Sequence, residues 1–214
     1  MIDLDGTLID TAPEITLAAN AMLDALNLPP LPRVTVQTFI GNGAAKLVER
    51  CMTEAMQETP NANLLIEAQT LFFAHYADVV SISQPYPQAE QGLQRLKESG
   101  LPLACITNKP AKFTVPLLQA TGFIDYFDLV VSGDTLLKKK PDPDQIFHIC
   151  KKFGIEPWDA LLIGDSNTDI LAAKNAGCYV FTVPYGYNQG LAIDHNHVDA
   201  MIEHLNDTFN YLDS

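Results

Sequence analysis

The chain begins "MIDLDGTLID" (residues 1–10), in which two carboxylates, Asp3 and Asp5, stand two positions apart. Side chains alternate along an extended strand, so residues two apart lie on the same face. We therefore expect a strand whose end directs two carboxylates at one point. Gly6 and Thr7 follow at once, and a glycine permits the sharp exit that such a strand end needs.

Further along the chain, apolar segments bounded by turn residues alternate with helical patterns. Strands are predicted at 101–107, 127–133, 160–165 and 179–183, and helices at 87–99, 111–121, 143–153 and 167–176. This alternation predicts an α/β fold with a Rossmann-like parallel sheet and helices on both faces. In such sheets ligands bind at the carboxyl ends of the strands.

The region from 13 to 84 breaks the alternation, because its patterns are helical only. Helices are expected near 14–27, 35–40, 43–57 and 63–80, and proline-rich segments punctuate the region. We therefore predict a catalytic core formed by residues 1–12 and 85–214. A small all-helical cap, residues 13–84, would be inserted after the first strand.

Composition narrows the class of protein. With 214 residues, 47% of them apolar, the chain can form one large domain or a core with an insertion. The net charge of −13 argues against a nucleic acid or an anionic membrane as partner. No apolar run approaches the ~20 residues that span a bilayer, and the four cysteines form no CxxC pair. We expect a cytoplasmic enzyme, monomeric or homodimeric, that acts on a small molecule.

Polar residues occur where the predicted strands end. "CITNK" places Thr107 and Asn108 after one strand, "IGDSNTD" places Asp165 and Asp169 after another, and "KKKPDP" places Lys140 between strands. Taken singly, each has an ordinary explanation as a solvated turn, a helix cap or an exposed charge. Their order at successive strand ends favours one common site.

Four of these stretches resemble known motifs. "DLDGTL", "ITNK", "KKPDP" and "GDSNTD" resemble, in order and over essentially the whole chain, the four motifs of the haloacid dehalogenase-like hydrolase superfamily. "FIGNGAAKLVER" (39–50) and "PYGYNQG" (184–190) are similar to segments of its bacterial phosphoglycolate phosphatase family. The resemblance implies a phosphomonoester hydrolase that depends on Mg²⁺, with the helical insertion acting as its cap.

The resemblance also implies roles for the strand-end residues. Asp3 would be the nucleophile that forms an aspartyl-phosphate, and Asp5 would be the general acid and later the general base. Thr107, Asn108 and Lys140 would hold the phosphoryl group.

The metal site implied by the resemblance uses hard oxygen ligands. Mg²⁺ would be bound by the Asp3 and Asp165 carboxylates and the backbone carbonyl of Asp5, while Asp169 would hold metal-bound waters. If Asp5 is neutral, the charges of the three remaining acids are cancelled by Mg²⁺ and Lys140. Such a site would be neutral before phosphate arrives, although the chain is acidic.

The expected substrate is 2-phosphoglycolate. Another small-metabolite phosphatase, a pyrophosphatase, a sugar-phosphate mutase and a truncated inactive relative remain alternatives. Because the core residues are committed to phosphate and metal, the substrate carboxylate needs other donors. The turn formed by Gly41, Asn42 and Gly43, at a helix N-terminus, is our first choice. Lys46 and Arg50, four apart on one helical face, are the second.

The short lead into Asp3 raises a separate expectation. Members of the superfamily that the motifs resemble usually carry several apolar residues before the first aspartate, whereas Met1 and Ile2 alone precede it here. Losing three or four buried side chains at ~1.5–3 kcal/mol each would rival the net stability of a domain. We expect either that the sequence starts late or that neighbouring strands close the gap, and the late start is the favoured expectation.

Overall fold

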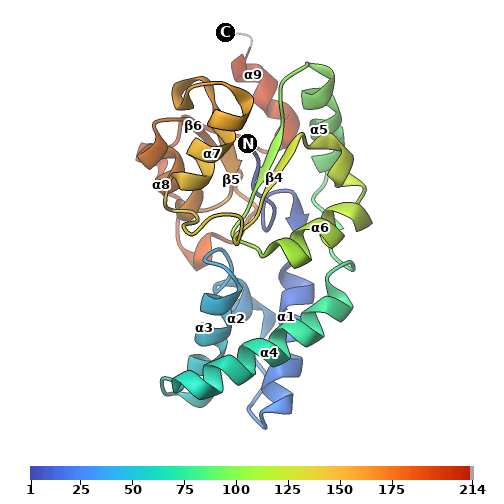
Figure 1. Ribbon diagram of the computed structural model, residues 1–214, viewed down its shortest axis with the longest axis vertical. Coiled ribbons are helices and arrows are strands. Elements are labelled where there is room, and N and C mark those ends of the chain that lie inside the picture. Colours follow the sequence, from blue (N-terminus) through green and yellow to red (C-terminus); the bar gives the residue numbers. More distant parts are fainter. Residues whose placement is uncertain (213–214) are drawn as a thin grey trace.

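The structure, a computed structural model, describes residues 1–212. It has two parts, a sheet flanked by helices and a bundle of helices below it (Figure 1). The strands of the main sheet are β3 (Ala104–Ile106), β4 (Leu129–Val131), β5 (Leu161–Gly164), β6 (Tyr179–Thr182) and β7 (Ala200–Met201). All their pairings are parallel, which confirms the α/β prediction. The strands are shorter than predicted, and β7 was not foreseen.

Residues 1–3 join the two halves of this sheet. Ile2 pairs in parallel with Cys105 of β3 on one side and with Ile163 of β5 on the other. The order is therefore β4, β3, residues 1–3, β5, β6, β7. The backbone N–H groups of Ile2 and Asp3 donate to Ala104 O at 2.8 Å and Ile163 O at 2.9 Å. This segment is consequently central in the sheet, and Asp3 lies where it leaves the sheet.

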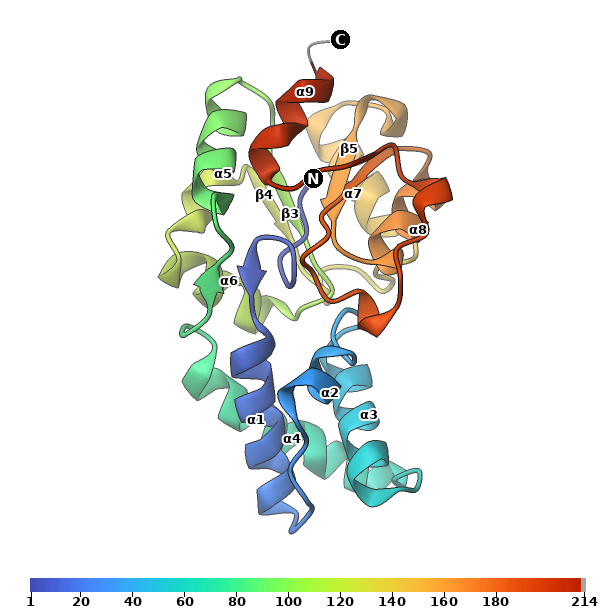
Figure 2. The same cartoon turned by 180° about the vertical axis from the view of Figure 1, so that it is seen from behind.

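Helices cover both faces of the sheet, as predicted (Figures 1 and 2). On one face lie α7 (Asp144–Phe153) and α8 (Asn167–Ala176), packed on Ala104 and Ile106. Cys105 points to the opposite face, where α5 (Ala89–Glu98), α6 (Ala111–Ala120) and the segment that leads into α9 (Phe209–Leu212) contribute core residues. The period-two alternation of strand side chains thus separates two apolar layers.

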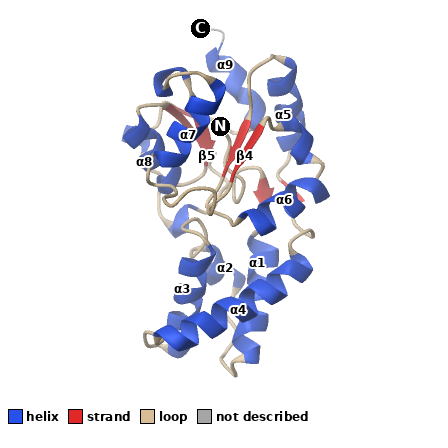
Figure 3. Ribbon diagram, in the orientation of Figure 1, coloured by secondary structure: helices blue, strands red, loops and turns tan. Residues whose placement is uncertain are grey.

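The bundle consists of α1 (Ala12–Ala25), α2 (Arg33–Gln37), α3 (Ala44–Met56) and α4 (Ala62–Val79) (Figure 3). Helix α1 buries Ile15, Ala19 and Met22, spaced three or four apart, as expected for an amphipathic helix that packs on a neighbour. Helix α4 begins at the N-cap Asn61, whose side chain accepts a hydrogen bond from Leu64 N at 3.0 Å.

Two short strands mark the passage between the sheet and the bundle. β1 (Ile9–Asp10) pairs antiparallel with β2 (Gln84–Pro85), so the outgoing and returning chain lie side by side. The cap limits predicted from the sequence, 13–84, lie next to this ribbon. Within residues 1–212, none of the helices is both long and apolar enough to cross a bilayer.

Candidate active site

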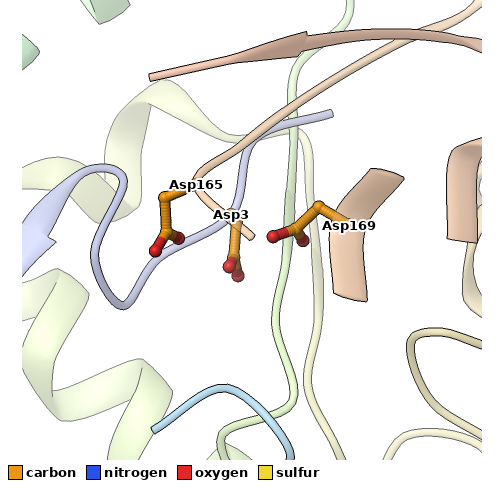
Figure 4. Close-up of side chains that lie close together, drawn as sticks. All are labelled: Asp3, Asp165 and Asp169. Carbon is orange, nitrogen blue, oxygen red and sulfur yellow. The ribbon is translucent and has the colours of Figure 1, made fainter. Parts of the chain in front are cut away.

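Three buried carboxylates gather at the carboxyl end of the sheet (Figure 4). Asp3 ends the central segment, Asp165 follows β5, and Asp169 lies in the first turn of α8. One oxygen from each lies within 4.8 Å of the other two. Residues predicted from separate strand ends are therefore brought together at one point.

Lys140 neutralises part of this charge. Its Nζ lies 2.8 Å from Asp3 Oδ1 and 2.6 Å from Asp169 Oδ1, and it donates to Ile106 O at 3.0 Å. Burial alone would lower the pKa of Lys140, but the carboxylates of Asp169 and Asp3 outweigh burial and raise that pKa. With its three partners in place, the ammonium group is a fixed cation beside Asp3.

Asp165 is held by two distant segments. Thr7 Oγ1 donates to its Oδ1 at 3.0 Å, and the backbone N–H of Tyr187 donates to its Oδ2 at 2.7 Å. A Cβ at Gly186 would lie 2.0 Å from the Asp165 Cβ, so the loop can approach only with glycine there. Gly6, at φ +85°, similarly leaves space for the Asp165 carboxylate. The "PYGYNQG" segment therefore helps to orient an acid of the site.

Asp169 is oriented by its own helix. Its Oδ2 accepts hydrogen bonds from Ser166 N at 3.2 Å and Ser166 Oγ at 2.6 Å, which forms a capping box at the start of α8. Because its Oδ1 contacts Lys140, both oxygens already have partners. This arrangement suits an acid that acts through its neighbours better than one that binds a metal directly.

The donor set suits a hard divalent cation. Three buried carboxylates lie close together and Lys140 pairs with two of them, Asp3 and Asp169, so acids outnumber the cation in this cluster. Burial raises the pKa of Asp165 to about 7, and the Asp169 carboxylate adds to this rise. Burial also raises the pKa of Asp3, with Lys140 acting in the opposite direction. Close oxygen ligands with uncompensated charge are what a site for such an ion requires.

Thr107 and Asn108 both line the cavity above the acids, as their positions predict. Thr107 Oγ1 accepts a hydrogen bond from Lys109 N at 3.1 Å, which leaves its hydroxyl hydrogen available to a ligand. Asn108 Nδ2 donates to Gly41 O at 2.9 Å and to Lys140 O at 2.8 Å. The Asn108 side chain thus joins the bundle to the loop that carries Lys140.

The 41–43 turn lies over the cavity. Gly41 and Gly43 line the space, which measures about 650 Å³ with its opening to solvent included, and Asn42 Nδ2 lies 3.4 Å from Thr168 Oγ1. The two cations of α3 are engaged elsewhere. Lys46 pairs with Glu49 at 2.8 Å, and Arg50 donates to Phe39 O at 3.2 Å.

A second buried charge cluster was not foreseen. Lys109 Nζ lies 2.8 Å from Asp5 Oδ1 and 3.7 Å from Glu14 Oε1, and it also contacts the Tyr76 hydroxyl. Tyr76 donates to Glu14 Oε1 at 2.6 Å. We call these four residues, Asp5, Glu14, Tyr76 and Lys109, the Lys109 cluster. The quoted "ITNK" motif contains Lys109, but no signal in the sequence connects it with residues 14 and 76.

Comparison with known proteins agrees with this geometry. A family model described as haloacid dehalogenase-like hydrolase matches residues 1–183. The chain is 48% identical, over 96% of its length, to phosphoglycolate phosphatases of Nitrosospira multiformis and Thiobacillus denitrificans, and it covers 91% of each. A crystal structure described as a predicted phosphoglycolate phosphatase from Haemophilus somnus superposes with a TM-score of 0.93. It is 35% identical, and the match covers 98% of this chain and 95% of that one.

Proposed function

The chain belongs to the haloacid dehalogenase-like hydrolases and is a phosphatase, and we propose that it converts 2-phosphoglycolate to glycolate and phosphate through an aspartyl-phosphate. The family resemblance inferred from the motifs is confirmed. The observation that carries the proposal is the position of Asp3. It lies at the carboxyl end of the central segment of the sheet, 2.8 Å from a fixed lysine and two residues before a second acid, and it lines a cavity that the 41–43 turn also lines.

In the first half of the reaction, a carboxylate oxygen of Asp3 attacks phosphorus. The bond between phosphorus and the glycolate oxygen breaks, and Asp5 gives its proton to the departing alkoxide. Lys140 and the Thr107 hydroxyl stabilise the phosphoryl oxygens, on which charge develops. In the second half, Asp5 takes a proton from water as the water attacks phosphorus. The bond to Asp3 then breaks, which releases phosphate and restores the carboxylate.

We propose that the metal bound at this site is Mg²⁺. Asp3 and Asp165, with the backbone carbonyl of Asp5, would hold it, and Asp169 would orient the waters around it. When bound, the ion supplies positive charge that offsets the repulsion between an anionic nucleophile and a phosphate dianion. The uncompensated charge of the three buried acids supports this assignment.

We assign the carboxylate of the substrate to the 41–43 turn. Gly41 and Gly43 line the cavity, and Gly43 is the N-cap of α3, whose first backbone N–H groups are free to bind an anion. Lys46 and Arg50 are weaker choices than they were from the sequence, because their side chains are engaged with Glu49 and Phe39. We also propose that the protein is cytoplasmic. All four cysteines are free thiols, which fits a reducing compartment.

A panel of small phosphate esters tests the proposal. With Mg²⁺, kcat/KM for 2-phosphoglycolate should exceed that for sugar phosphates and pyrophosphate by at least about tenfold, which corresponds to ~1.4 kcal/mol. Chelation of the metal should remove activity on every ester. A preference for a sugar phosphate or for pyrophosphate would overturn the substrate assignment, and full activity in the presence of a chelator would overturn the metal assignment.

A further inference from the structure

The Lys109 cluster spans the boundary between the bundle and the sheet. Asp5 and Lys109 belong to the sheet side, whereas Glu14 lies in α1 and Tyr76 in α4. Lys109 and Glu14 have side chains that are 3% and 0% exposed, so little water is available to either charge. The Lys109 ammonium gains two of its oxygen neighbours only where the bundle sits on the sheet.

Such a cluster needs an explanation other than stability. Removing a lysine and a glutamate from water costs several kcal/mol per ion, and apolar side chains of similar volume would often do as well or better. The ring of Tyr76 stacks on Phe72 and packs against Phe113, and Glu14 is fully buried in α1. The charges are thus placed at some cost in an apolar setting, beside the residue that the reaction uses as acid and base.

The geometry argues against direct recognition of substrate by Lys109. Two of its three donors are engaged in hydrogen bonds to Asp5 Oδ1 and the Tyr76 hydroxyl, and the Glu14 carboxylate, 3.7 Å away, pairs with its charge. A substrate anion would have to compete with the Glu14 carboxylate for the charge of this ammonium. By contrast, the contact with Asp5 Oδ1 fixes one oxygen of that carboxyl group and so sets the direction of the other.

We propose that Glu14 and Tyr76 hold Lys109 so that its ammonium orients the Asp5 carboxyl group, which makes proton transfer to the leaving group depend on the docked cap. Lys109 is then a positioning residue, and Glu14 and Tyr76 act through it. The inference rests on the proposed function, because it takes Asp5 as the general acid. A displacement of about 1 Å in such a group can cost about 100-fold in rate.

The test compares two leaving groups in three variants, Tyr76→Phe, Glu14→Gln and Lys109→Met. Ethyl phosphate releases a strongly basic alkoxide and needs the acid, whereas p-nitrophenyl phosphate releases a weak base and needs it little. We expect the rate of the first phosphoryl transfer from ethyl phosphate, measured in a single turnover, to fall about 10-fold in Tyr76→Phe and Glu14→Gln and about 100-fold in Lys109→Met. The rate of the same transfer from p-nitrophenyl phosphate, which the pre-steady-state burst of p-nitrophenolate reports, should stay within about threefold of that of the unmodified protein.

Lys112→Met is the matched control, since Lys112 is an exposed lysine three residues away that contacts the Phe73 ring. It should leave both substrates unchanged. Lys109→Met leaves two carboxylates unpaired and can unfold, but Tyr76→Phe removes only a hydroxyl group, and thermal unfolding verifies that it folds. Equal losses in the first transfer from both esters in folded Tyr76→Phe and Glu14→Gln, or no loss on either, would overturn the inference.

The failure of the inference is distinct from that of the proposed function. If Asp5→Asn itself shows the same loss in the first transfer from both esters, or if the unmodified protein hydrolyses neither, the acid role of Asp5 is wrong and the inference falls with it. If Asp5→Asn discriminates between the leaving groups and the three variants do not, only the positioning role of Lys109 is wrong.

Discussion

The Lys140 ammonium lies 2.8 Å from the Asp3 carboxylate, although the two residues come from segments that are far apart in the chain. The contact fixes one oxygen of Asp3 against a cation that is itself held by Asp169 and by Ile106 O. A carboxylate held in this way enters the reaction with its orientation already set, so little freedom is lost when it attacks.

Asp3→Asn should abolish turnover of every phosphate ester while the protein stays folded. An amide has almost the same shape as a carboxylate, but it cannot attack phosphorus. We expect kcat to fall at least about 10⁴-fold, which corresponds to ~5.4 kcal/mol of lost stabilisation of the transition state. Steady-state kinetics with p-nitrophenyl phosphate measure this loss.

Asp78→Asn, a change at an exposed position of α4, is the control and should retain full activity. Activity of Asp3→Asn above the level of a trace contaminant would disprove the nucleophile assignment.

Asp5→Asn should separate esters by their leaving groups. An asparagine cannot give a proton to an alkoxide, but a p-nitrophenolate can depart without one. Phosphoglycolate hydrolysis should fall about 100-fold or more, and the first phosphoryl transfer from p-nitrophenyl phosphate should fall much less. A pre-steady-state burst of p-nitrophenolate reports that first transfer even where the later attack of water has become slow. Equal losses in the two transfers would instead assign Asp5 a structural role.

The residues at the strand ends could be predicted because their placement is local. Asp3, Thr107 and Asp165 each follow an apolar strand, and parallel strands bring their carboxyl ends to the same edge of a sheet. The sequence therefore determines where these side chains gather without any knowledge of how distant segments dock.

The Lys109 cluster could not be predicted for the opposite reason. Glu14 lies in the first turn of a helix, where an acid is ordinarily explained by the helix dipole, and Tyr76 lies on an apolar helix face. Which face of each helix meets the sheet depends on how the bundle docks, and that depends on many contacts at once. The same limit applies to Lys46. The sequence places Lys46 on a helix face, but it does not show that the Lys46 ammonium pairs with Glu49 rather than reaching the cavity.

Loss of the metal should change how stability depends on pH. The pKa of Asp165 is about 7 in the folded protein, against 3.8 for an ordinary aspartate. Between these values the folded state binds more protons than the unfolded state, so the free energy of unfolding falls as pH rises. In the metal-free protein, the contribution of Asp165 is fully present below about pH 4 and is lost by about pH 7.

Differential scanning calorimetry with and without Mg²⁺ measures this effect. At pH 7.5, Mg²⁺ at about 100 times its Kd should add ~2.7 kcal/mol to the free energy of unfolding, which raises the Tm by about 5–11 °C for a chain of this size. At pH 5.5 the rise should be smaller, because protons compete with the metal for the carboxylates. Asp165→Asn should lose both the metal effect and most of its difference between the two pH values. A Tm that Mg²⁺ leaves unchanged at pH 7.5 would contradict the assigned metal site.

Replacing Asn42 by leucine should impair recognition of the carboxylate of the substrate. Asn42 lies between two glycines that line the cavity, at φ +116° for Gly41 and +89° for Gly43, and its Nδ2 lies 3.4 Å from Thr168 Oγ1. A leucine there cannot keep this contact, so the turn should shift and misplace the N–H groups at the start of α3. KM for phosphoglycolate should rise about tenfold, or ~1.4 kcal/mol, with little change in kcat. p-Nitrophenyl phosphate lacks a carboxylate and should be hydrolysed with nearly unchanged constants.

Lys46→Met, on the same helix but paired with Glu49 at the surface, is the control and should affect neither substrate. An equal rise in KM for both esters in Asn42→Leu would mean that the turn serves to dock the bundle on the sheet and does not bind the carboxylate of the substrate.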